Sequence, residues 1–210
     1  GDERLIEGFR SGEDVHRLTA GQVFGVAPQD VTPQMRSQAK AVNFGIVYGI
    51  SAFSLAQDIG VTQAEARRYI DTYLEKYHGV RDYMERTIAE AKEKGYCETL
   101  YGRRRALPEL ASSSFNVRAF GERVARNMPI QGTAADVMKL AMLRADRLLR
   151  ERAPQARLLL QVHDELIAEC PAGQEEIVKA ALTEAMDGAA QLSVPLTVDA
   201  KAGRSWADAH

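Results

Sequence analysis

The sequence has little cysteine, no long apolar run and almost no net charge. Its two cysteines, Cys97 and Cys170, lie far apart in a chain of 210 residues. This spacing fits neither a metal site nor a disulfide framework, so a reducing compartment is the expected location. No apolar segment approaches the ~20 residues that cross a bilayer, and no signal peptide is visible. We therefore expect no membrane partner.

The net charge of −2 gives no sign of a protein that binds nucleic acid over its whole surface. Basic residues are nevertheless concentrated locally, because residues 95–130 carry six arginines against three glutamates. Residues 1–33 show the opposite bias. A nucleic-acid site is therefore expected only as a local patch. The hydrophobic fraction of 45% at this length supports one large domain or two small ones.

Apolar residues recur at helical spacing through most of the chain. Thr32 precedes Pro33, an arrangement that starts a helix, and Thr62 begins a capping box with Glu65. Pro129 is expected to kink or break the helix that contains it. The expected helices cover residues 13–24, 33–50, 51–59, 62–77, 80–94, 115–128, 132–152 and 173–190.

Three segments have the shorter period of strands. Residues 96–107 look like a short hairpin, and residues 156–170 contain two strand-like runs around a polar tip. Residues 194–203 alternate apolar and polar side chains and are expected to form a last strand. The predicted fold class is therefore α+β, with a helical middle and an α+β C-terminal third.

The stretch RSQAKAVNFGIVYG, residues 36–49, carries two different faces when it is drawn as a helix. The apolar face is expected to be buried and consists of Ala39, Val42, Ile46 and Ile50. The second face holds two cations and then two aromatic rings: Arg36, Lys40, Phe44 and Tyr48. One interpretation is a nucleotide site with cations on phosphates and rings on sugar or base. The alternative is a solvated basic pair beside two core aromatics.

Two further polar patterns can be interpreted either as functional sites or as polar residues that merely face solvent. Asp164 and Glu165 lie at the tip of the second predicted hairpin, where they suit a metal ion or are merely polar turn residues. Arg123, Asn127 and Gln131 recur every fourth residue and share one helical stripe. Such side chains suit the hydrogen-bond acceptors of the minor groove, although a solvated helix face would look the same.

These three motifs, in this order, resemble those of family A DNA polymerases, the bacterial DNA polymerase I type. Residues 36–49 match R-x3-K-x3-F-x3-Y-G, residues 123–136 match the template-contacting helix, and residues 161–165 (QVHDE) match the second catalytic carboxylate motif. The resemblance covers residues 1–210. It implies a right-hand polymerase fold, with residues 1–110 mainly fingers and residues 111–210 the C-terminal half of the palm.

The resemblance implies a role for each matched side chain. Arg36 and Lys40 would hold the triphosphate of an incoming deoxynucleotide, together with His16. Phe44 would lie against the sugar and would imply discrimination against dideoxynucleotides, while Tyr48 would stack near the templating position. The primer-template DNA would be contacted by Arg123, Asn127, Gln131 and His163.

The same resemblance implies two-metal catalysis with Mg²⁺ at the carboxylates. Asp164 would be a metal ligand, with Glu165 a weaker second candidate for a catalytic role. The family's other catalytic aspartate lies in a D-Y-S-x-x-E-x-R motif, which this sequence does not contain, because Asp82 and Tyr83 are followed by Met84. The chain also begins without Met. We therefore expect part of a longer polymerase, inactive alone.

Two other classes of protein remain open. The chain is either a non-catalytic module that binds DNA or nucleotide, or a helical scaffold that binds neither. The resemblance further implies a bacterial cytoplasmic protein at the nucleoid. Surface meant for absent palm strands would favour self-association.

Overall fold

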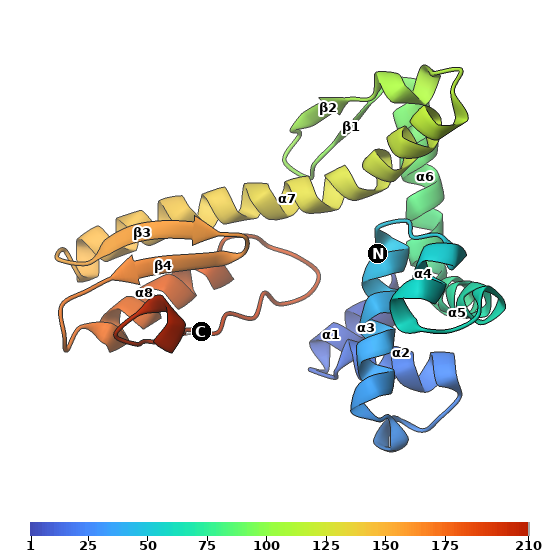
Figure 1. Ribbon diagram of the computed structural model, residues 1–210. Helices are drawn as coiled ribbons and strands as arrows, with labels where there is room; N and C mark the ends of the chain where they lie inside the picture. Colours follow the sequence, from blue (N-terminus) through green and yellow to red (C-terminus); the bar gives the residue numbers. More distant parts are fainter. Residues whose placement is uncertain (210) are drawn as a thin grey trace. The chain divides into compact units, whose positions relative to one another are not determined.

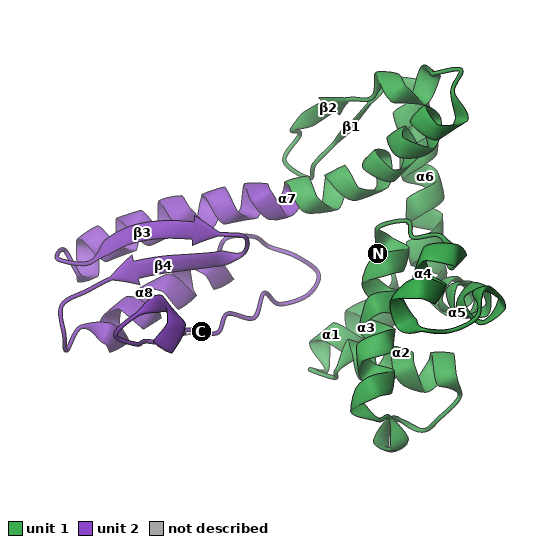
Figure 2. Cartoon of the chain, viewed as in Figure 1, with its two compact units in different colours: residues 1–132 green, residues 133–210 purple. Residues whose placement is uncertain are grey.

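The computed structural model describes residues 1–209, which fall into two compact units divided after Gly132 (Figure 2). Position 210, the last residue of the expected palm segment, lies outside the described residues. The proposed boundary between fingers and palm after residue 110 stays a prediction, because a compact unit and a polymerase subdomain are different divisions of a chain.

Unit 1 consists mainly of helices (Figure 1). Its helices before the first strand are α1 (Glu3–Arg10), α2 (Val15–Phe24), the short 3-10 turn η1 (Pro28–Asp30), α3 (Pro33–Val47), α4 (Ala52–Ile59), α5 (Gln63–Lys76) and α6 (His78–Lys94). The expected helices of this region are therefore confirmed, with ends displaced by a few residues.

Side-chain caps explain where most of these helices begin. A cap accepts a hydrogen bond from a backbone N–H that the first helical turn leaves without a partner. Thr62 and Glu65 form the predicted capping box, and Thr32 caps α3 with Pro33 in the first turn. The remaining side-chain caps are Asp2, Asp14 and Ser51.

The main core of unit 1 lies where α3, α4 and α5 meet. Val42 and Ile46 of α3 pack there with Leu55 of α4 and with the buried rings of Tyr69 and Tyr73. Burial of these apolar side chains fixes which face of α3 turns inward. The opposite face is left at the surface.

A small hairpin follows α6 and confirms the expectation for residues 96–107. Strands β1 (Tyr96–Glu98) and β2 (Arg104–Ala106) pair antiparallel, and the 3-10 turn η2 (Pro108–Ala111) follows them. Cys97 and Leu107 pack with Leu110 and with Ala125 of the next helix. This second cluster positions the start of that helix within unit 1.

The next helix, α7, runs without a break from Phe115 to Arg152. The break expected at Pro129 is wrong, because Pro129 lies inside this one helix, while the kink that was the other expectation stays a prediction. An internal proline removes one backbone donor and crowds the preceding turn. Both flanking segments are packed, at Ala125 before the proline and at Met138 after it, and this burial keeps the helix in one piece.

Unit 2 packs a hairpin and a helix against the second half of α7. Strands β3 (Arg157–Val162) and β4 (Glu165–Glu169) pair antiparallel, followed by α8 (Glu175–Asp187) and the 3-10 turn η3 (Trp206–Asp208). The core of the unit contains Leu148, Leu149, Val178, Ala181 and Ala185. With two small antiparallel sheets and many helices, the predicted α+β class is confirmed.

The expected last strand over residues 194–203 is wrong. Within residues 1–209 this segment has no strand conformation, and β3 and β4 pair only with each other. An alternating pattern becomes a strand only when a neighbour satisfies its backbone groups, and this segment has no such neighbour in the described chain.

No described helix is both long and apolar enough to cross a membrane.

Candidate functional site

The outer face of α3 carries an exposed strip of cations and aromatic rings, defined here as Arg36, Lys40, Phe44 and Tyr48. The rings of Phe44 and Tyr48 are 47% and 40% exposed. The interpretation of these rings as core aromatics is therefore wrong. The buried face is as expected at Ala39, Val42 and Ile46.

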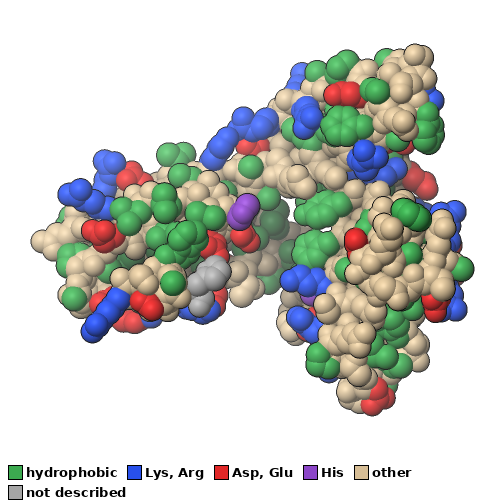
Figure 3. Space-filling view, viewed as in Figure 1, with side chains coloured by type: hydrophobic (Ala, Val, Ile, Leu, Met, Phe, Trp, Pro, Cys, Tyr) green, Lys and Arg blue, Asp and Glu red, His purple; other side chains and the backbone are tan. Residues whose placement is uncertain are grey.

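The members of the α3 strip form one continuous surface. The Phe44 and Tyr48 rings are stacked with centroids 6.3 Å apart, and Lys40 Nζ lies 5.9 Å from the Phe44 centroid. On the visible face of unit 1, Figure 3 shows hydrophobic side chains next to those of Lys and Arg. Apolar rings left in water beside cations are typical of a surface that receives a ligand with both planar and anionic parts.

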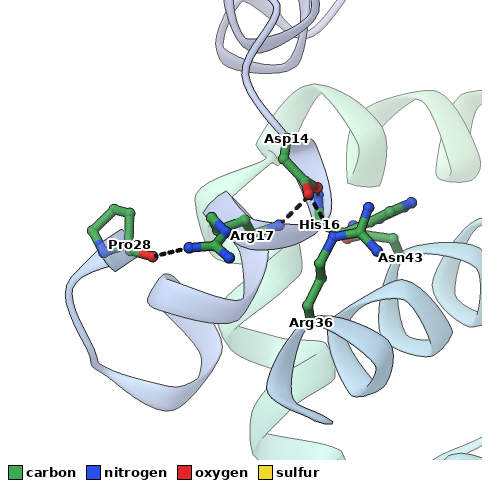
Figure 4. A network of polar contacts seen from close by, with 6 residues as sticks. All are labelled: Asp14, His16, Arg17, Pro28, Arg36 and Asn43. Carbon is green, nitrogen blue, oxygen red and sulfur yellow. Dashed lines mark hydrogen bonds and ion pairs between the residues drawn. The ribbon is translucent and has the colours of Figure 1, made fainter. Parts of the chain in front are cut away.

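An ion pair joins the first cation of the strip to α2 (Figure 4). Arg36 Nε donates to Asp14 Oδ2, while the other oxygen of Asp14 accepts from the backbone N–H groups of His16 and Arg17. The hydrogen bond from Arg36 is the largest of several effects that hold the pKa of Asp14 below its ordinary value. Asp14 is thus an ionised cap that also fixes the position of Arg36.

His16 faces the same strip from α2 (Figure 4). Its ring centroid lies 5.8 Å from that of Phe44, and its Nδ1 lies 2.9 Å from Asn43 Nδ2. Burial lowers the pKa of His16, and the cations Arg36 and Lys40 lower it further, against the opposing effect of Asp14. An amide nitrogen only donates, so Nδ1 accepts and the ring proton of the neutral imidazole lies on Nε2.

Asn43 is a site residue that the sequence interpretation missed. It is buried on α3, and its Oδ1 has no hydrogen-bond partner within residues 1–209. A polar side chain among the apolar residues of a helix is a sequence signal for such a site, because a buried polar group normally needs a hydrogen-bond partner. Its partner His16 lies 27 residues away, so spacing alone could not identify the pair.

Both glycines of the α3 motif have a structural reason. A Cβ at Gly45 would lie 2.9 Å from Ile50 Cγ2, so a larger residue would displace that side chain. Gly49 has φ of +75°, and a Cβ there would lie 2.7 Å from Arg126 Nη1. The left-handed φ favours glycine at Gly49, and a larger residue would also displace the end of the Arg126 side chain.

The predicted template stripe lies on the first part of α7. Arg123 and Gln131 are exposed and Asn127 is half-buried. Asn127 Nδ2 donates to the carbonyl oxygen of Tyr48 at 3.4 Å. Within unit 1, the stripe and the α3 strip therefore meet at the C-terminal end of α3.

The predicted carboxylates lie in unit 2, at the turn between β3 and β4. Val162 pairs with Glu165, so His163 and Asp164 form a two-residue turn. His163 has φ of 52°, a left-handed value that is uncommon for residues other than glycine. The turn presents His163 and Asp164 to solvent, whereas Glu165 is partly buried.

A metal site would need more ligands than this turn offers. Among residues 1–209 there is no group of three His, Cys, Asp or Glu side chains that could hold a metal ion. Asp164 fits one Mg²⁺ ligand, since it is an exposed carboxylate on a tight turn and Mg²⁺ prefers oxygen. Further carboxylates would have to come from elsewhere.

Comparison with known proteins gives matches over nearly the whole chain. The family described as DNA polymerase family A matches residues 1–208. DNA polymerase I of Bacillus subtilis (strain 168) is 54% identical over 208 residues, and that of Geobacillus stearothermophilus is 52% identical over 208 residues; each alignment covers 99% of this chain and 24% of the relative. The chain thus spans about a quarter of these curated relatives.

A solved structure has the same fold. It is the POL domain of Pol1 from M. smegmatis in complex with DNA primer-template and dNTP, with a TM-score of 0.92 and 43% identity. The match covers 98% of this chain and 36% of that one.

Proposed function

Because this chain belongs to DNA polymerase family A, we propose that it supplies the nucleotide-binding and template-binding surfaces of an enzyme that extends a DNA primer. The observation that carries this proposal is the exposed α3 strip, with cations and stacked rings in the order of the family motif. The relatives are named DNA polymerase I, and the solved relative holds DNA primer-template and dNTP.

The triphosphate of the incoming nucleotide would lie along the first turns of α3. Arg36 offers a planar fork and Lys40 a point charge, and both suit phosphate oxygens. His16 would donate from Nε2–H, since Asn43 occupies its Nδ1. Arg36 would exchange or share its bond to Asp14 when phosphate arrives.

The rings of the α3 strip would contact the rest of the nucleotide and the template. Phe44 would pack against the sugar, and Tyr48 would stack near the templating base. Arg123, Asn127 and Gln131 would face the minor groove, whose acceptors are nearly the same for every base pair. A polymerase needs such degenerate contacts, because it must accept every sequence.

The β3–β4 turn would serve the reacting end of the primer. We propose that His163 contacts the primer terminus and that Asp164 is a Mg²⁺ ligand, with Glu165 a weaker candidate for a catalytic role. A bound pair of Mg²⁺ ions stabilises the attacking and leaving oxygens in phosphoryl transfer. Since the described residues offer no cluster of three ligands, Asp164 would need further ligands to complete the metal site.

The second candidate is a module that binds DNA or nucleotide without catalysis. The lack of a D-Y-S motif and of a three-ligand cluster within residues 1–209 favours this function for the chain alone. The two candidates agree on the binding surfaces and differ on chemistry.

The 210-residue chain should therefore bind a fluorescent primer-template but fail to extend it with Mg²⁺ and dNTP. Binding should weaken steeply with salt, because released counterions drive association with DNA. Absence of binding to DNA and dNTP at any salt would favour a helical scaffold. Extension that Asp164→Ala abolishes would mean that another acid completes the metal site.

Self-association of the chain and its location in the cell both remain proposals. Leu159 and Leu160 of β3 are about half exposed, which favours self-association or coverage by further palm strands. Sedimentation of the chain would distinguish a monomer from an oligomer. The location at the bacterial nucleoid likewise remains a prediction.

A further inference from the structure

Arg126 lies near the C-terminal end of α3, within residues 123–136, but it is not one of the side chains to which the family motif gives a role. It is on α7, three residues after Arg123, so the side chains of Arg123 and Arg126 lie next to each other on the helix surface, and both approach Gly49. A Cβ built on Gly49 would lie 2.7 Å from Nη1 of Arg126, so the guanidinium lies directly against this glycine. A side chain at position 49 would push this guanidinium from its present place.

The guanidinium of Arg126 has no acidic partner within residues 1–209. Its Nε is buried and makes no hydrogen bond in the described chain, while the residue as a whole is half-buried. By contrast, Lys92 on the neighbouring α6 is paired with Glu122. A cation with one end buried and unpaired is costly unless its open end meets an anion.

The C-terminus of α3 accounts for only part of this arrangement. The last carbonyl groups of a helix carry partial negative charge and favour a nearby cation. However, no hydrogen bond joins Arg126 to these carbonyls in the described chain, and the Tyr48 carbonyl already accepts from Asn127. The guanidinium therefore retains its capacity to donate to a ligand.

The neighbouring ring indicates which ligand would reach Arg126. Tyr48 is the residue before Gly49, and its ring is 40% exposed. Unpaired bases stack on exposed aromatic rings, whereas paired bases are already stacked within the duplex. A strand with a base on Tyr48 would place its sugar-phosphate backbone along the adjacent surface, where Arg126 and Arg123 lie.

We propose that Arg126 binds a phosphodiester of the unpaired template strand beside Tyr48. This inference rests on the proposed DNA-binding function and adds a phosphate subsite to it. A phosphate contact positions the strand and carries no sequence information, so its effect is the same for every template sequence.

The test is the salt dependence of DNA binding by the 210-residue chain. The ligands are a primer-template with an unpaired 5′ template overhang, a blunt duplex and dNTP alone. Arg126→Met keeps most of the side-chain length and removes the charge. One lost phosphate contact in single-stranded DNA should reduce the slope of log K against log salt by ~0.7. The affinity ratio of wild type to variant should then shrink about 2.6-fold between 50 and 200 mM salt.

Three controls separate this role from a structural one. Arg126→Lys should keep the wild-type slope, because its charge remains. Arg150→Met changes an exposed arginine of α7 that is paired with Asp146, and it should leave the slope unchanged. Blunt duplex and dNTP should bind Arg126→Met as they bind wild type.

An unchanged slope for Arg126→Met on overhang DNA would overturn the subsite while leaving DNA binding intact. An equal loss on blunt duplex would assign the phosphate to the duplex and would also contradict the proposal. If the wild-type chain binds no DNA even at low salt, the proposed function fails together with this inference.

Discussion

Arg36 Nε donates to Asp14 Oδ2, so the first cation of the α3 strip also belongs to the cap of α2. Asp14 therefore has two tasks: it satisfies backbone N–H groups of α2, and it holds the Arg36 guanidinium in a fixed place. A triphosphate on α3 would compete with this carboxylate for Arg36. The pair thus connects the local stability of unit 1 to its proposed binding site.

Asp14→Asn should destabilise the chain by only about 0.2–1 kcal/mol, the range for a partly exposed ion pair. Asparagine caps helices as well as aspartate does, so this change isolates the charge. Asp14→Ala removes the cap as well and should cost a further ~1 kcal/mol. Urea unfolding gives the free energy of unfolding of both variants. Equal losses of stability in the two would contradict separate contributions from the charge and from the cap of Asp14.

The effect of Asp14→Asn should depend on pH. The folded-state pKa of Asp14 is lowered, chiefly by Arg36, so the stabilisation is complete above the ordinary carboxyl pKa of about 4. It is lost as the pH falls through the lower folded-state value. Wild type and Asp14→Asn should therefore differ at pH 7 and converge in acid; a constant difference from pH 7 to acid would refute the assignment.

Lys40→Ala should weaken dNTP binding by about 10- to 100-fold, the scale of one hydrogen bond to a charged group. Lys94→Ala is the matched control, since Lys94 is paired with Glu90 on α6, away from the α3 strip. Fluorescence titration with a labelled dNTP gives both affinities. Equal affinities for the two variants would remove Lys40 from the phosphate site.

Gly49→Ala should destabilise unit 1, because alanine meets both a left-handed φ and the Arg126 guanidinium. The backbone term alone costs roughly 1–2 kcal/mol. Adding Arg126→Ala should recover the steric part and leave the backbone part. A double-mutant cycle of unfolding free energies measures this coupling, and strict additivity would mean that the two residues do not meet.

Phe44→Tyr should increase the use of dideoxynucleotides relative to deoxynucleotides. A phenolic oxygen can replace the contact of the missing 3′-hydroxyl, and the phenyl ring of Phe44 cannot. The readout is primer extension by Bacillus subtilis DNA polymerase I in which this chain replaces the 208 aligned residues. An unchanged ratio of chain termination would argue against a position of Phe44 beside the sugar.

Periodicity predicted the two faces of α3 but not which rings are buried. Val42 and Ile46 are apolar and face the core as expected. Phe44 and Tyr48 are as apolar as many core residues, so only the packing of α4 and α5 decides that they stay outside. The contacts of Asp14 with Arg36 and of His16 with Asn43 join residues 22 and 27 positions apart, which no local pattern reports.

The errors in the sequence prediction also arose from tertiary context. Pro129 is a strong local breaker, yet packing on both sides keeps α7 continuous. Residues 194–203 have a strand pattern, yet no described strand pairs with them. Helix starts were easier to predict, because Thr32 and Thr62 act on backbone groups a few residues away.

We propose that this chain supplies the binding surfaces and one catalytic carboxylate of a DNA polymerase. The most direct measurement is Mg²⁺-dependent primer extension by the same Bacillus subtilis chimera, with and without Asp164→Asn. We expect extension by the chimera and a loss of at least about 100-fold in the variant, the scale on which one preorganised catalytic group acts. Glu169→Gln, on the same hairpin, should retain activity. A folded chimera that binds DNA but never extends it, or one that extends equally well with Asp164→Asn, would contradict a catalytic role for this chain.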